Sequence, residues 1–115
     1  KSFRFVIFYI GFNSTMDMRV AITVPAGATL KFGGIGIGTT ATSAAQAEVM
    51  NVVEIFASGT ALLVGSSSAA IMLILEGIVV NSTNAGNVQL QWAQATAEAN
   101  NLTVEANSYV LHQAT

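Results

Sequence analysis

The chain has 115 residues, of which 52% are hydrophobic and only 9% charged, with a net charge of −2 at pH 7 and no cysteine. This length predicts a single domain over residues 1–115, and the absence of cysteine excludes disulfides and thiolate metal sites. The few scattered basic residues exclude an extended nucleic-acid footprint. Because an ordinary globular chain has about a quarter of its residues charged, much of the surface is expected to face a membrane or other protein.

Short apolar or alternating segments separated by Gly, Pro, Asn and Ser fill most of the sequence. Turn residues recur every 8 to 15 positions, a spacing typical of an all-β sandwich or barrel. The predicted strands are Ser2–Ile10, Met18–Val24, Thr29–Phe32, Val49–Ala57, Ala61–Val64, Ala69–Val80, Val88–Ala95, Leu102–Ala106 and Ser108–Gln113.

For two segments, a helix is an alternative to a strand. Residues 40–56 carry alanine, glutamine and glutamate behind a Ser or Thr cap, but their valines and Ile55 favour a loop or one helical turn that leads into a strand. Residues 61–80 have the length of a membrane span, yet Ser66–Ser68 and Glu76 interrupt them. We therefore expect no membrane insertion.

The segment 69–80 is apolar on both parities, so neither side of the predicted strand is an ordinary wet face. One face is expected to line the core and the other to meet a neighbouring subunit; the alternative is a central strand that a loop covers. Neutral amides also alternate with apolar residues in 86–99. The predicted oligomer interface comprises Gln89, Gln91, Met72, Ile74 and Ile78, and the predicted core comprises Phe5, Ile55, Leu73, Leu75, Leu90 and Trp92.

Motifs for catalysis or cofactor binding are weak. The glycines of "FGGIGIGTT" (32–40) do not fit the dinucleotide spacing, and no Walker lysine follows them, so close packing of strands is the better interpretation. His112 and Asp17 are each unique, and a triad would need these two to meet. Of the five glutamates, Glu76 is expected to be buried with Arg4 or Arg19 as its partner. We expect no enzyme activity, no cofactor and no metal.

Carbohydrate binding is the alternative that the residues leave open. Asn13, Asn81 and Asn101 begin N-x-S/T triplets, for which chance occurrence is the default in a chain rich in Asn and Thr. Trp92 and the aromatic residues of 3–9 could stack on sugars if they were exposed. A carbohydrate-binding module of a secreted or surface protein would therefore display coplanar aromatic side chains.

The last third of the chain resembles the end of a domain found in structural proteins of tailed bacteriophages. The matching features are Glu76-Gly77, Ala85-Gly86, Trp92-Ala93-Gln94, Thr103-Val104 and Ser108-Tyr109. Asn107 stands where the pattern has glycine, a change that a left-handed Asn can absorb.

The resemblance implies a jelly-roll-like antiparallel β-sandwich that forms a homotrimer on the virion exterior. Such a non-enzymatic protein would decorate or cement the capsid, or belong to a tail fibre or spike. Its partners would be other virion proteins of the capsid or tail, with a host-surface glycan as a further candidate. Neutral amide faces agree with a permanent interface, because no lone charge is buried there.

Overall fold

A computed structural model describes residues 1–39 and 57–114, in which all regular elements are β-strands and all strand pairs are antiparallel. The prediction of an antiparallel all-β fold is thereby confirmed. The strands are β1 (Ser2–Ile10), β2 (Met18–Thr23), β3 (Thr29–Ile35), β4 (Leu62–Val64), β5 (Ile71–Val80), β6 (Gln89–Gln94), β7 (Thr103–Val104) and β8 (Tyr109–Gln113).

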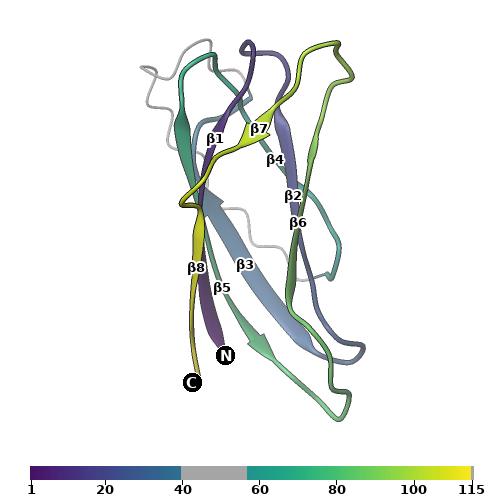
Figure 1. Cartoon of the computed structure of the whole chain (residues 1–115). Coiled ribbons are helices and arrows are strands. Elements are labelled where there is room, and N and C mark those ends of the chain that lie inside the picture. The colour runs from purple at the N-terminus through teal and green to yellow at the C-terminus, as the bar shows by residue number, and fades with distance from the viewer. Residues whose placement is uncertain (40–56, 115) are drawn as a thin grey trace.

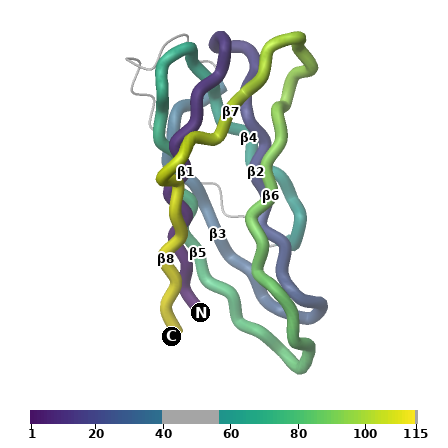
Figure 2. The backbone as a smooth tube through the Cα atoms, viewed as in Figure 1, coloured from purple at the N-terminus to yellow at the C-terminus, as the bar shows by residue number. Residues whose placement is uncertain are grey.

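The strands form two sheets that pack against each other (Figure 1). Sheet A has the order β3-β5-β1-β7, with β8 also pairing with β1, and sheet B has the order β4-β2-β6. Successive described strands alternate between the two sheets as far as β7, because each connection crosses from one layer to the other. Both termini lie at the same end of the domain (Figure 2).

The core lies between the sheets and is built from one parity of each main strand. Tyr9, Leu73 and Leu75 from sheet A and Met18 and Ile22 from sheet B are fully buried. Alternation along a strand points successive side chains to opposite faces, so each of these strands also presents a second row outward. Leu73 and Leu75 thus occupy the core as predicted, and Phe5 and Leu90 pack against it while partly buried.

The structure corrects the prediction for one core residue, Trp92. Two further predictions concern residues 40–57. Trp92 lies on the inward parity of β6 but is 45% exposed, because β6 is the last strand of its sheet and has a described neighbour on one side only. The expected strand Val49–Ala57, apart from Ala57 in a bend, and the expected loop or helical turn in 40–56, including Ile55, lie outside the described residues.

Gly34 and Gly77 lie where side chains of neighbouring strands leave no room for a Cβ atom. A Cβ atom on Gly34 would lie 2.8 Å from Leu62 and 2.9 Å from Leu75, and one on Gly77 would lie 2.6 Å from Phe32 Cβ and 2.7 Å from Phe3. Ordinary contacts need more than 3.4 Å. Close strand packing, as predicted for this glycine-rich segment, therefore accounts for Gly34.

We predict that Gly77→Ala lowers the free energy of unfolding by about 1–3 kcal/mol, because the added methyl overpacks a site that backbone and aromatic atoms already fill. Thr29→Ala, at an exposed position of neighbouring β3, is the control and should change it by less than about 0.5 kcal/mol. Urea unfolding followed by circular dichroism measures both. Equal stabilities of the two variants would contradict the packing described for Gly77.

Candidate interaction surfaces

The outer face of sheet A is apolar although it points away from the core. Met72 and Ile78 on β5 are 49% and 47% exposed, Leu111 on β8 is 57% exposed, and Ile74 is half-buried. The strand register puts Tyr109 and Ile74 on either side of the buried Val6. Several exposed apolar side chains on one face are typical of protein contact sites. The face also has a hollow of about 430 Å³ over Gly33, beside Ile35, Ile74 and Ile78.

One ion pair crosses the middle of this face. Arg4 and Glu76 are opposite each other in the register of β1 and β5, and Arg4 donates from Nη2 to Glu76 Oε1 at 2.7 Å and from Nε at 3.1 Å. The partner predicted for Glu76 is confirmed, but the expected burial is wrong, because its side chain is 60% exposed. The reason is parity: Glu76 follows the core residue Leu75 and points outward.

The outer face of sheet B carries neutral amides, small residues and the cation Arg19. Gln89 and Gln91 are exposed there, and the register places Ala21 beside Gln91 and Arg19 beside Ala93. The predicted interface residues therefore divide between opposite faces of the molecule: Gln89 and Gln91 lie on sheet B, whereas Met72, Ile74 and Ile78 lie on sheet A. A contact that uses the same face of both subunits would bury one of these two sets, whereas a head-to-tail contact would bring the two faces together.

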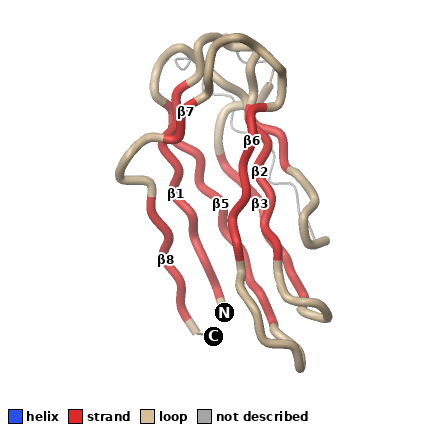
Figure 3. Tube along the Cα trace, turned by 45° about the vertical axis from the view of Figure 1, so that its right-hand side comes forward, coloured by secondary structure: helices blue, strands red, loops and turns tan. Residues whose placement is uncertain are grey.

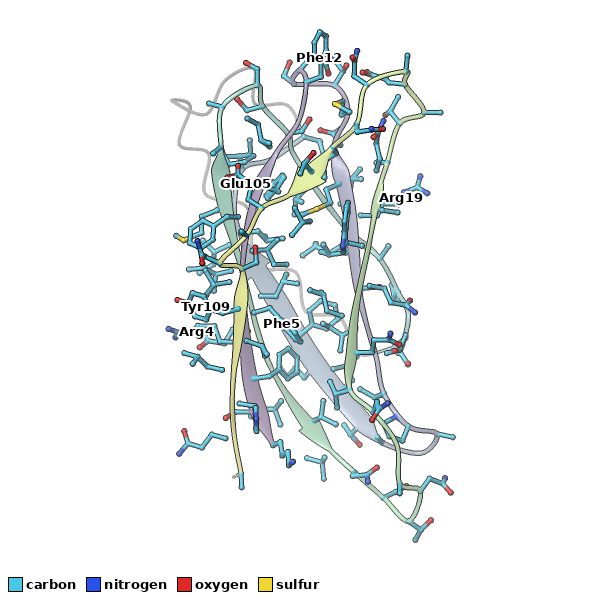
Figure 4. All side chains as sticks on the ribbon, in the orientation of Figure 1. Arg4, Phe5, Phe12, Arg19, Glu105 and Tyr109 are labelled. Atoms are coloured by element: carbon cyan, nitrogen blue, oxygen red, sulfur yellow. The ribbon has the colours of Figure 1, made fainter. Side chains whose placement is uncertain are left out.

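Between β6 and β8 the edge of the sandwich is open (Figure 3). Two hollows of about 460 and 250 Å³ follow this edge and share Phe5 and Val110 as lining residues. We call this the open-side groove, defined by Phe5, Val88, Leu90, Trp92 and Val110. Figure 4 shows Phe5 pointing into it. The residues alone could not reveal the groove, because β6 pairs with β2 in sheet B and β8 pairs with β1 in sheet A. Only the packing of the two sheets brings β6 and β8 to the same side of the sandwich.

Hydrogen bonds hold the turn after β1 in a fixed shape. Asn13 Oδ1 accepts from the backbone N–H groups of Thr15 and Met16, and Asn13 Nδ2 donates to Glu98. The buried Ser66 hydroxyl accepts from Asp17 N at 2.9 Å and donates to Asn13 O at 2.8 Å. Ser66, one of the serines that interrupt residues 61–80, therefore anchors this turn, and the Asn13 amide is occupied within the fold.

Asp17 and Tyr9 are neighbouring groups with shifted pKa values. Burial, with a smaller contribution from the negative charge of Asp17, raises the pKa of the Tyr9 hydroxyl far above its usual range; this hydroxyl donates to Gly65 O. Desolvation raises the pKa of the Asp17 carboxyl, and an interaction of this carboxyl with the Ser66 backbone N–H partly offsets the rise. Asp17 Oδ1 is buried without a hydrogen-bond partner among the described residues.

We predict that Asp17→Asn raises the free energy of unfolding at pH 7 by up to about 1 kcal/mol. The raised pKa means that the folded state binds the Asp17 proton more tightly than the unfolded chain. The wild-type protein therefore loses stability as the pH rises through the folded pKa, and the variant, which carries no charge, does not. Asparagine also tolerates the φ of 51° at this position.

Urea denaturation of both proteins between pH 3 and pH 7 measures this difference. The two stabilities should converge at the acid end, where the carboxyl is protonated in both states. A variant that is less stable at pH 7 would mean that the carboxylate makes a favourable contact.

The described titratable residues do not converge on a catalytic constellation. His112 pairs in register with Phe3 near the start of β1, whereas Asp17 follows the turn after β1 ends. Glu76 pairs with Arg4, Glu98 binds Asn13, and the Glu105 backbone binds Phe8. Glu48 and Glu54 lie outside the described residues. Within the described part, no group of three or more acidic or histidine residues could hold a metal ion.

The exposed aromatic residues are dispersed over the fold. Phe12 occupies the turn after β1 and Tyr109 the outer face of β8 (Figure 4). Trp92 lies in the open-side groove. A coplanar sugar-stacking surface would need several of them side by side. Trp92 and Tyr109 do line the same hollow, from different sheets.

Comparison with known proteins gives no relative: no family model, no curated protein and no solved structure matches this chain. Among the described residues there is no helix of sufficient length and hydropathy to cross a membrane.

Proposed function

We propose that this domain is a non-enzymatic structural protein of a tailed-bacteriophage virion, displayed on the particle exterior as a homotrimer. The observation that carries the proposal is the apolar outer face of sheet A, where Met72, Ile78 and Leu111 are each about half exposed. A chain with 9% charged residues gains by keeping such a face covered in a permanent assembly. Gln89 and Gln91 add neutral polar groups that need no charged partner.

A jelly-roll-like topology is part of this proposal. The alternation of successive strands between sheets supports it, since two packed sheets with repeated crossovers are the architecture of that fold class. Asn107, which has a φ of 70°, fills the position where the phage pattern has glycine. In the assembled particle, the outer face of sheet A contacts another virion protein of the capsid or tail.

Immunogold electron microscopy of phage particles from the source culture tests the location. Label over the shell is expected for a decoration or cement protein, and label confined to the tail or fibre ends is expected for a fibre or spike. Unlabelled particles would contradict the virion proposal and favour a secreted carbohydrate-binding module, which a glycan array would then test.

We further predict that the double variant Met72→Lys/Ile78→Lys reduces the fraction of protein that sediments with particles by at least about tenfold, because two desolvated charges oppose docking. Both side chains are exposed in the single chain, so folding should be retained. Thr60→Lys, in the exposed turn before β4, is the matched control. Undiminished sedimentation of the double variant would exclude this face as the docking surface.

A further inference from the structure

The two strands that border the open-side groove have unprotected edges. β6 ends sheet B, and β8 pairs with β1 and with no other described strand. Their sequences, QLQWAQ and YVLHQ, contain no proline and no Lys, Arg, Asp or Glu. Monomeric proteins usually protect such edges with charge or proline. These edges are therefore suited to pair with another strand.

The groove between these edges favours an apolar occupant. Trp92 and Val110 are 45% and 46% exposed there, and Val88 is also exposed. The hollow beside Trp92 is lined mainly by apolar side chains, and the hydroxyl of its Ser108 already accepts from Phe8 N and donates to Glu105 O. Apolar side chains would fill this part of the groove, whereas the hollow nearer the N-terminus also has polar lining residues, among them Asn81 and Asn87.

Two opposite charges flank the groove without a partner. Among the described residues, neither the Arg19 guanidinium nor the Glu105 carboxylate forms an ion pair or hydrogen bond. Arg19 lies on the outer face of sheet B beside the small Ala93 of the edge strand β6, and it lines one hollow together with Trp92. Glu105 precedes β8 on sheet A, and both lie toward the same end of the sandwich (Figure 4). They are placed to pair between copies.

We propose that the occupant of the open-side groove is a second copy of this chain. Around a three-fold axis, β6 of one subunit lies beside β8 of the next, and Arg19 faces the partner subunit's Glu105. The two strands run in opposite directions along the sandwich (Figure 1), as antiparallel pairing requires. The contact joins different surfaces of identical chains, which is the type of contact that closes rings.

This inference rests on the proposed homotrimer and specifies where its subunits meet. The side chains of Trp92, Val110 and Phe5 from three copies would form a shared apolar centre. The outer face of sheet A would then remain available for the neighbouring virion protein.

Charge reversal tests the contact. Arg19→Glu and Glu105→Arg should each raise the concentration for half-dissociation of the trimer by at least about tenfold, because like charges then face each other. The double variant Arg19→Glu/Glu105→Arg should restore assembly. Light scattering over a concentration series measures the mass, and Thr60→Glu, in the turn before β4 at the far edge of sheet B, is the control.

Trp92 provides a second measurement because it is the sole tryptophan. In the trimer its emission should shift to shorter wavelength and resist acrylamide quenching, and dilution below the dissociation range should reverse both changes. A trimer whose tryptophan is quenched as readily as in the monomer would overturn the proposed contact.

The outcomes separate this inference from the proposed function. A wild-type monomer at all concentrations contradicts the homotrimer and, with it, the groove contact. If both single charge-reversal variants still form the trimer, the proposed homotrimer stands and only the groove contact is overturned. A dimer that depends on both charges overturns the three-fold arrangement.

Discussion

The central strand pair β1 and β5 has apolar side chains on both faces, but sheet B can cover only one of them. Tyr9, Leu73 and Leu75 fill the covered side and anchor the core. Met72 and Ile78 on the other side stay in water in the single chain. The sandwich therefore has a complete core and an apolar exterior at the same time, and this exterior is the basis of the proposed contacts.

The few charges on this exterior are arranged so that a contact would bury little uncompensated charge. Arg4 and Glu76 neutralise each other on the outer face of sheet A, whereas Arg19 and Glu105 remain unpaired on either side of the open-side groove. A pair satisfied within one chain can enter an interface without leaving an isolated charge. An unpaired charge instead favours a particular neighbour. The outer face of sheet A, with its internal ion pair, is therefore suited to docking on a neutral partner surface. The open-side groove, with Arg19 and Glu105 beside it, is suited to a contact in which the two chains meet in one fixed alignment.

The polar groups inside the domain serve its architecture. The Ser66 hydroxyl and the Asn13 amide hold the turn after β1, and the raised pKa of Asp17 is a consequence of its partial burial beside them. With His112 at the other end of β1, these groups are not arranged as a general acid and base. The structural proposal thus agrees with where the polar side chains lie, and the proposed groove contact adds a role for Arg19 and Glu105 that no sequence motif indicated.

The sequence by itself determined the strands, because alternation and turn residues are local: β1 agrees with its predicted bounds, and β5 and β6 fall within theirs. It also identified Leu73 and Leu75 as core and Met72 and Ile78 as surface. Only the tertiary structure decided which strands became edges and which faces lie opposite each other. Trp92 has the parity of a core residue and yet stays half exposed, because coverage depends on a neighbouring strand and not on the strand's own pattern. Strand pairing between segments far apart in the chain decides that coverage.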